Sequence, residues 1–246
     1  MKKNQNQQLQ VPPLFYADWD SVVMIHLEVD PMALQQVTPF LIDTFDGKGY
    51  ITLVAFTLRH LRPTFGGRLA AGLLRPIATH EFLNVRTYVK VNGEAGIHFL
   101  AEWLPNQLSV WLGPRTFGLP YRLGENHYEH EPERNHFCGR IRDVATATEL
   151  RYQGRLANPD RQPTTATPAS LEAFLWERYT AFNDKQGKRL KFHVTHPPWP
   201  MRELKLNLPE TRLLTQNWPF IQDAHLVGAH FCEGLQDVQM SGVRNV

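Results

Sequence analysis

The side chains best suited to binding a small anion lie in one stretch of the sequence, residues 84–124. Asn84, Arg86 and Tyr88 alternate there with β-branched residues, and this period of two predicts that they share one face of a half-buried strand. Asn92-Gly93 comes next, and both residues accept the positive φ angles of a tight hairpin. A guanidinium among aromatic rings can form the floor of an anion-binding pocket. The alternative is an outward-facing Arg that covers aromatic side chains.

The returning strand of this hairpin completes the predicted binding face. With a loop of two or four residues and regular alternation, Ile97, Phe99, Ala101 and Trp103 fall on the same face as Arg86. Arg115, farther along the chain, offers a further guanidinium to a bound anion. The residues that we expect to bind a ligand are therefore Asn84, Arg86, Tyr88, Phe99, Trp103 and Arg115.

The Gly118-Leu119-Pro120 turn leads to the candidate catalytic residues, Tyr121 and Arg122. The Tyr121 phenol can donate a proton or a hydrogen bond, and the guanidinium of Arg122 or Arg115 can hold a carboxylate with two hydrogen bonds. We predict that Tyr121 and Arg122 bear on one cavity together with Arg86. The alternative is that the tyrosine packs in a core and that the arginines lie on the surface.

The histidines and cysteines do not predict a metal site or a nucleophile. The pairs His127/His130 and His193/His196 have a spacing of three, which points side chains to opposite faces of a strand. HExxH and Cys/His quartets are absent, so we expect no metal and no cofactor. His136 and Cys138 share a strand face, but they are roughly 7 Å apart, too far for a direct hydrogen bond.

Composition excludes several classes of partner. The 246 residues are 42% hydrophobic and carry a net charge of +2, which gives no electrostatic case for binding nucleic acid or an acidic membrane. No apolar stretch approaches the roughly 20 residues that span a bilayer. The first ten residues, MKKNQNQQLQ, lack the apolar region of a signal peptide and predict a disordered polar tail. Two cysteines without CxxC spacing indicate free thiols in a reducing compartment, so we expect a cytoplasmic protein.

The pattern of predicted elements indicates one domain over residues 11–246, with an α+β fold that is mainly antiparallel β and forms a barrel or a strongly bent sheet with a few helices. The predicted strands cover residues 22–29, 41–44, 50–58, 84–91, 97–103, 122–131, 136–143, 149–157, 191–194, 203–208, 224–232 and 235–240. The predicted helices cover residues 32–37, 107–112 and 171–179. Residues 59–80, with three glycines and an apolar centre, are expected to form a flap with a short helix near residues 69–74 that covers the mouth of the pocket.

Six motifs occur in a distinctive order: VDPMAL (29–34), LIDTFDGKGYI (41–51), NVRTYV (84–89), GPRTFGLPYR (113–122), LEAFLWERY (171–179) and HPPWP (196–200). This order resembles the YqjF family of uncharacterised bacterial proteins, which belongs to the acetoacetate decarboxylase-like superfamily. The matching motifs cover most of the chain. The resemblance implies an acetoacetate decarboxylase-like barrel, but the family has no settled reaction to carry over.

The departures from the decarboxylase itself bear on mechanism. That enzyme has a Pro-Lys-Lys turn, whose first lysine forms a Schiff base because the neighbouring cation lowers the pKa of its amine. The resemblance places Pro120-Tyr121-Arg122 at this turn, and a guanidinium that stays protonated cannot act as an amine nucleophile. The decarboxylase arginine before the first helix corresponds to Glu28. Schiff-base decarboxylation is therefore disfavoured.

Two classes of function fit these observations. The first is the binding or transformation of a small carboxylate-bearing metabolite by Arg and Tyr side chains without an imine. The second is a non-catalytic structural or interaction domain whose barrel is filled by apolar side chains. A small anionic metabolite and a second copy of the chain are the partners considered.

Overall fold

The computed structural model describes residues 12–246, so the predicted tail lies outside the described residues. The strands are β1 (Pro13–Val29), β2 (Leu41–Ile42), β3 (Gly49–Pro63), β4 (His80–Val91), β5 (Glu94–Leu104), β6 (Tyr121–Glu131), β7 (His136–Asp143), β8 (Glu149–Leu156), β9 (Thr180–Lys185), β10 (Lys188–Thr195), β11 (Arg202–Glu210), β12 (His225–Ser241) and β13 (Arg244–Asn245). The helices are α1 (Pro31–Gln35), α2 (Gly67–Leu74), α3 (Gln107–Thr116), α4 (Leu171–Trp176) and α5 (Arg212–Asn217), with 3₁₀ turns η1 (Arg75–Ile77), η2 (Pro132–Arg134) and η3 (Pro219–Asp223).

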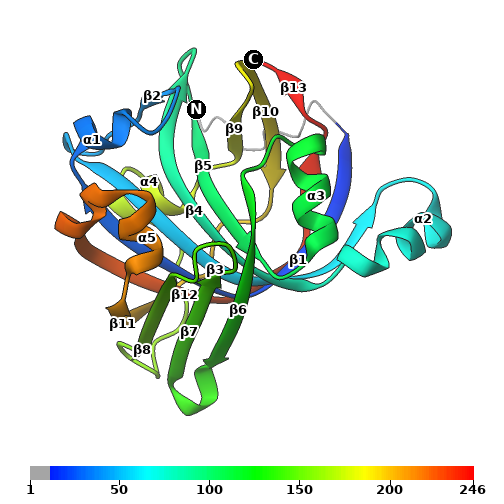
Figure 1. Ribbon diagram of the computed structural model, residues 1–246. Helices are drawn as coiled ribbons and strands as arrows, with labels where there is room; N and C mark the ends of the chain where they lie inside the picture. The colour runs from blue at the N-terminus through cyan, green and yellow to red at the C-terminus, as the bar shows by residue number, and fades with distance from the viewer. Residues whose placement is uncertain (1–11) are drawn as a thin grey trace, which may run out of the picture.

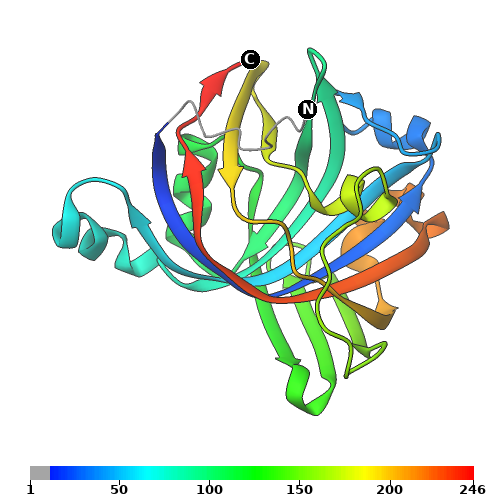
Figure 2. The ribbon, with the colours of Figure 1, turned by 180° about the vertical axis from the view of Figure 1, so that it is seen from behind.

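The long strands β12, β1, β3, β4 and β5 pair in this order and form a curved wall through the middle of the molecule (Figure 1). Below the wall, β6, β7, β8 and β11 continue from β5 back to β12 and close one ring. Above it, β9 and β10 connect β5 to β12 and close a second ring. The wall is thus shared by two buried clusters of side chains on opposite faces of the same strands, called the lower and upper compartments from here on (Figures 1 and 2).

The upper ring closes at a very close contact between β5 and β9. Only Ile97 and Ala181 are paired there, and the two strands run parallel. A Cβ atom on Gly96 would lie 2.5 Å from the carbonyl oxygen of Thr180, which is far inside van der Waals contact. Glycine is therefore required at this position because the two backbones approach each other too closely for a side chain.

Strand alternation assigns the side chains of the wall to the two compartments. On β1, Val23 and Ile25 face the lower compartment, whereas Met24 faces the upper one. Successive side chains of a strand point to opposite faces, and here both faces are buried. The lower compartment is filled by an apolar cluster, which includes Leu53, Val85, Ala101, Trp103, Phe137 and Phe231.

These observations confirm the predicted fold class and most of its strands. Asn92 and Gly93 have positive φ angles of 52° and 83°, as the hairpin prediction required. The predicted helix at 107–112 runs on as α3 to Thr116 with Pro114 inside it, and the Asn106 side chain caps its start by accepting a hydrogen bond from the Ser109 N–H. The predicted helix at 171–179 is shorter, and the strand β9, which was not predicted, follows it.

The flap over residues 59–80 is placed differently from the prediction. It does contain a helix, α2, but this helix projects away from the barrel (Figures 1 and 2). Leu69 and Leu73 are 86% and 82% exposed, so the apolar centre does not dock on the barrel or cover a pocket mouth. Among residues 12–246, no helix has both the length and the apolar character needed to cross a membrane.

Candidate functional site

A β-bulge in β5 changes the predicted binding face. Pairing between β4 and β5 shifts register at Leu100, so Val85 pairs with Ala101 and Arg86 pairs with Phe99. Phe99 stays on the Arg86 face, in the upper compartment, but Ala101 and Trp103 turn into the lower one. The prediction that Trp103 shares a face with Arg86 is therefore wrong, because the extra residue reverses the alternation that the sequence suggested.

Arg86 is buried in the upper compartment without a carboxylate partner. Its side chain is held among apolar and aromatic groups at 6% exposure, and none of the described acidic residues lies within 4.0 Å of it. One Nη atom donates to the carbonyl of Leu175, at 3.2 Å, and approaches the sulfur of Met24, at 3.9 Å. Its Nε–H has no partner. A guanidinium stays charged, so this is a buried positive charge whose donors are only partly satisfied.

A chain of hydrogen bonds beside Arg86 fixes the tautomer of a buried histidine. The Tyr88 hydroxyl donates to the Leu175 carbonyl at 2.9 Å and therefore accepts from Thr52, 2.5 Å away. The Thr52 hydroxyl must then accept from Nδ1–H of His26, at 2.9 Å. Nε2 of His26 is left as an unpaired acceptor in the same compartment. Burial and the nearby charges of His230 and Arg86 lower the pKa of His26 well below 6.5, so the ring is neutral.

Further unpaired polar atoms gather in the upper compartment. The indole N–H groups of Trp176 and Trp199 are buried and have no hydrogen-bond acceptor among the described residues. Nδ1 of His230 is also unpaired, and its ring lies 4.6 Å from Trp176 and 5.3 Å from His26. Buried donors without partners cost free energy, so a group of them is a reason to expect an acceptor that binds there.

A second cluster of polar side chains lies on three adjacent strands and faces the same compartment. Asn84 on β4 pairs with Glu102 on β5, which pairs with Tyr121 on β6. Burial raises the pKa of Glu102 well above its usual value and, with Glu102 beside it, does the same for Tyr121. One carboxyl oxygen of Glu102 and the amide oxygen of Asn84 lack partners. Burial thus favours the protonated form of Glu102, which can donate a hydrogen bond.

Helix α3 presses closely on Tyr121. A Cβ atom on Gly113 would lie 2.2 Å from the Tyr121 ring, so only glycine allows this contact. The ring also packs edge-on against Phe82, with centroids 5.7 Å apart. Gly113 thus lets α3 pack against Tyr121 and hold it beside Glu102.

The other two predicted arginines do not lie in this compartment. Arg122 alternates with Tyr121 and turns to the opposite face, where its guanidinium lies 5.2 Å over the Trp103 ring and donates to the amide oxygen of Asn217 at 2.5 Å. Arg115 is exposed and lies 4.4 Å over the Trp111 ring. The prediction that Arg122 bears on one cavity with Arg86 is therefore wrong, because adjacent residues of β6 point to opposite faces.

None of the described lysines is buried in either compartment. Lys48 and Lys191 form ion pairs with Glu28 and Glu94 at 2.6 and 2.8 Å, and both keep part of their side chain exposed. The remaining described lysines, all exposed or half-buried, are Lys90, Lys185, Lys188 and Lys205. Amines are thus absent from the described residues that face Arg86.

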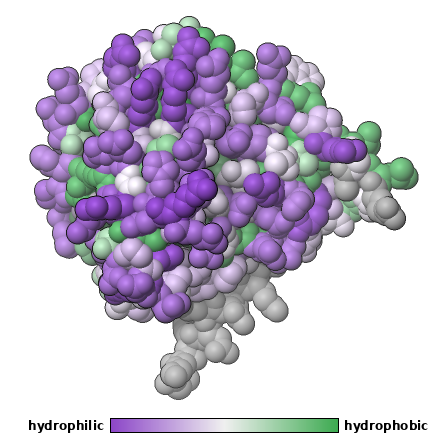
Figure 3. Space-filling view, turned by 90° about the horizontal axis from the view of Figure 1, so that it is seen from below, coloured by the Kyte–Doolittle hydropathy of each residue, from purple (hydrophilic) through white to green (hydrophobic). Residues whose placement is uncertain are grey.

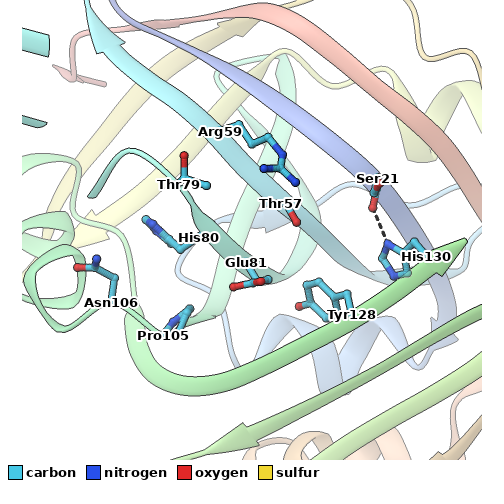
Figure 4. Close-up of a pocket in the computed structure, with 10 residues that line it drawn as sticks. All are labelled: Ser21, Thr57, Arg59, Thr79, His80, Glu81, Pro105, Asn106, Tyr128 and His130. Carbon is cyan, nitrogen blue, oxygen red and sulfur yellow. Dashed lines mark hydrogen bonds between the residues drawn. The ribbon is translucent and has the colours of Figure 1, made fainter. Parts of the chain in front are cut away.

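An outer cleft of about 520 Å³ lies beside the ends of β4 and β6 (Figure 4). His80 lines it, buried, with both ring nitrogens unpaired, and burial lowers its pKa to about 4. The His80 ring packs on Phe82 at 4.7 Å, and Phe82 packs in turn on Tyr121. Aromatic side chains therefore separate this cleft from the polar interior. None of the predicted site residues lines it.

His130, at the other end of the cleft, is held in one tautomer (Figure 4). Its Nδ1 lies 2.7 Å from the Ser21 carbonyl, which can only accept, so Nδ1 carries the proton. Nε2 then accepts from the Tyr152 hydroxyl at 2.6 Å. Burial lowers the pKa of His130 to about 4, and the neutral ring joins β1, β6 and β8 in a structural role.

Comparison with known proteins places this geometry in a family. The model of the DUF2071 family of uncharacterised conserved proteins matches residues 16–236. The uncharacterised protein YqjF of Bacillus subtilis (strain 168) is 28% identical over 194 residues, which cover 77% of this chain and 76% of YqjF.

Solved structures with the same fold have little sequence identity to this chain. An acetoacetate decarboxylase-like enzyme from Sphingomonas wittichii RW1 superposes with a TM-score of 0.66 at 13% identity, over 100% of this chain and 98% of its own. The enduracididine biosynthesis enzyme MppR, in complex with pyruvate, gives 0.66 at 14% identity over 98% and 93%. Acetoacetate decarboxylase from Legionella pneumophila gives 0.63 at 13% identity over 100% and 99%. The fold is that of the acetoacetate decarboxylase-like proteins, and the chain belongs to the DUF2071 family, with YqjF as a relative.

Proposed function

We propose that the protein binds a small carboxylate-bearing metabolite in the upper compartment, with Arg86 as the anion-binding residue. The observation that carries this proposal is the burial of the Arg86 guanidinium at 6% exposure without a carboxylate partner among the described residues. A buried charge is ordinarily paired, and removing one partner of a buried pair leaves a large desolvation cost. A bound carboxylate supplies the missing partner.

The surrounding groups define what else the ligand needs. The indole N–H groups of Trp176 and Trp199 are further donors for an anion, and Nε2 of His26 is an acceptor for a hydroxyl or amine of the ligand. Asn84 lies two residues along β4 from Arg86, about 7 Å away, and it pairs with Glu102 on β5. A ligand of a few carbon atoms, with a carboxylate at Arg86 and an oxygen at Glu102, spans this distance.

We further propose that no Schiff base forms. The decarboxylase-like Pro-Lys-Lys turn is replaced by Pro120-Tyr121-Arg122, and every described lysine is at least partly exposed, away from Arg86. Borohydride reduces imines to stable amines, so treatment of the protein with acetoacetate or pyruvate and borohydride should leave its intact mass unchanged. A stoichiometric adduct on a lysine would contradict this part of the proposal and leave anion binding by Arg86 standing.

Thermal unfolding with pyruvate, acetoacetate and related carboxylates tests the binding site. A charge-assisted hydrogen bond contributes about 1.5–3 kcal/mol, so Arg86→Met should weaken carboxylate binding by roughly 10- to 100-fold. Arg115→Met removes an exposed guanidinium and is the matched control, which should bind as the wild type does. Failure of all these carboxylates to stabilise the wild type, or equal binding by Arg86→Met, would instead favour the non-catalytic interaction domain. Native mass spectrometry of the purified protein would then show whether another ligand is bound.

A further inference from the structure

The outer face of the β6–β7 hairpin holds a group of side chains that the barrel interior does not use. Glu129, His136 and Cys138 each offer one ligand atom, and these three atoms lie within 4.8 Å of one another. The hairpin extends below the shared wall (Figure 1). The view from below shows a predominantly hydrophilic face (Figure 3). Glu129 and His136 are exposed, and Cys138 is half-buried.

Strand pairing brings the three residues together. Glu129 pairs directly with Cys138, and Glu131 pairs with His136, so the three side chains occupy neighbouring positions on one face. His136 and Cys138 are two residues apart, which places both on the outer side of β7. Phe137 between them is fully buried in the lower compartment. A slip in register would expose that phenylalanine, so the packing of the inner face fixes the outer group.

The distances between the ligand atoms suit one tetrahedral ion. Zn²⁺ binds sulfur at about 2.3 Å and nitrogen or oxygen at about 2.0–2.2 Å, which puts neighbouring ligand atoms roughly 3.3–3.7 Å apart. Oε2 of Glu129 lies 3.7 Å from Sγ of Cys138 and 3.6 Å from Nε2 of His136. The three atoms therefore need only small side-chain movements to share an ion.

A fourth residue positions the carboxylate of this group. Nε2 of His127 lies 3.3 Å from Oε1 of Glu129, on the other side of the carboxylate from His136 and Cys138. A hydrogen bond to the free oxygen of a coordinating carboxylate orients that ligand, which is the usual task of a residue behind a metal ligand. The group thus contains both candidate ligands and a support for one of them.

We propose that Glu129, His136 and Cys138 bind a zinc ion on the outer face of the hairpin, with His127 orienting Glu129. A thiolate, an imidazole and a carboxylate form a donor set that zinc accepts, whereas magnesium and calcium prefer oxygen donors alone. Three protein ligands leave one coordination position open. His136 also borders a groove of about 460 Å³ that is lined by Arg155 and Lys205, so an anion in this groove can reach the open position.

This site differs from the proposed carboxylate site in residues and in place. The carboxylate site faces the upper compartment from β4 and β5, whereas the zinc ligands point outward from β6 and β7. Either site can fail in experiment without affecting the other. The spacing of three places His127 and His130 on opposite faces of a strand. The pairing of Glu129 with Cys138 across the hairpin has no signal in that spacing.

Titration of the untagged full-length protein with Co²⁺ tests the zinc site, because cobalt takes the place of zinc and reports its ligands by absorption. We expect one Co²⁺ per chain, with the visible bands of a tetrahedral ion, a thiolate-to-metal charge-transfer band, and displacement by Zn²⁺. Cys138→Ser should abolish the charge-transfer band. Cys232→Ser, which removes the buried thiol of the upper compartment, is the control and should retain it.

The supporting role of His127 has a separate test. His127→Ala should weaken zinc binding by about 10- to 100-fold while keeping the charge-transfer band, because it removes the group behind the carboxylate and no ligand. Thermal unfolding checks that the exposed-residue variants remain folded. Absence of a charge-transfer band in the wild type, or its persistence in Cys138→Ser, would overturn the zinc site. Unchanged affinity in His127→Ala would remove His127 from it.

Discussion

The two compartments are built on the same strands, yet their contents differ. On the lower face, β1, β3 and β4 contribute Val23, Leu53 and Val85, which pack in an apolar cluster without exposure. The indole N–H of Trp103, at the edge of that cluster, is paired with Asp143 at 2.8 Å. On the upper face, the alternate residues include His26, Thr52 and Arg86, and Nε2 of His26 and Nε of Arg86 lack partners.

Under the proposed function, this difference separates stability from binding within one sheet. Residues on one face of the wall form an apolar core, and residues on the other face form a second cluster in which apolar side chains surround His26, Thr52 and Arg86. A substitution in a wall strand should therefore affect either folding or ligand binding, according to the face on which it lies. The following substitutions test this separation.

The largest effect on stability is expected on the lower face, at Leu53. Leu53→Ala should lower the free energy of unfolding by about 2–5 kcal/mol, because it removes a fully buried side chain and leaves a cavity. Urea denaturation measures this change. The affinity of the folded variant for carboxylates should stay that of the wild type. A loss of affinity as large as that of Arg86→Met would show that the two compartments are coupled.

Arg86→Met should have the opposite effect on the unliganded protein. Replacing buried charged groups by apolar side chains of similar volume is often neutral or stabilises by about 1–4 kcal/mol. We therefore expect the unliganded variant to melt at the wild-type temperature or above it, although it binds carboxylates more weakly. A marked fall in the melting temperature would show that the hydrogen bond to the Leu175 carbonyl makes Arg86 part of the structure.

Glu102 should make the stability of the folded protein depend on pH. Burial raises its pKa above 4.5, so above that pH the folded state holds a proton that the unfolded state has lost. Stability should then fall as pH rises from about 4.5 toward the folded-state pKa, by up to about 1.4 kcal/mol per pH unit. The Glu102→Gln variant does not titrate at this position. The difference in the free energy of unfolding in favour of the variant should therefore grow over this pH range and vanish below it.

Histidines with lowered pKa values make stability depend on pH in the opposite direction to Glu102. Burial lowers the pKa of His230 and His80 to about 4, so their contribution to stability is present above pH 6.5 and is lost as pH falls toward 4. Both the wild type and Glu102→Gln contain these histidines, so their effect cancels when the two proteins are compared by urea denaturation at each pH. A difference between the two proteins that does not change with pH would show that Glu102 is ionised in the folded state.

The smallest effect is expected at α2, outside both compartments. Leu69→Ser changes a side chain that is 86% exposed, so the free energy of unfolding should change by no more than about 0.5 kcal/mol. Carboxylate binding should also remain unchanged. Weaker carboxylate binding by this variant in thermal unfolding would restore the prediction of a flap that acts on the pocket.

The sequence predicted well what local patterns determine. Alternation identified β4, and the Asn92-Gly93 pair identified the hairpin that follows it. The resemblance to the YqjF family gave the barrel. Arg86 and Tyr88 were also assigned correctly to one face, since no irregularity interrupts β4 between them.

The predictions that failed depend on contacts between distant residues. A bulge at Leu100 has no signal in a run of apolar residues, and without it Glu102 was expected to point away from Arg86. His26 and Trp176 were not proposed as site residues because a lone polar group in an apolar segment resembles an ordinary core residue. Their unpaired atoms become visible only when β1, β12 and α4 are packed together.

The bulge at Leu100 also limits how this protein can evolve. Deleting this one extra residue would let Ala101 follow Phe99 with regular alternation, and Glu102 and Trp103 would keep their present faces. Deleting Glu102 with the bulge in place would instead bring Trp103 opposite Asn84, onto the face of Arg86. A change of length in the projecting segment around α2 would disturb neither face of the wall. Natural variants should therefore tolerate loss of the bulge residue and changes of length beside α2, and exclude other changes of length from β5.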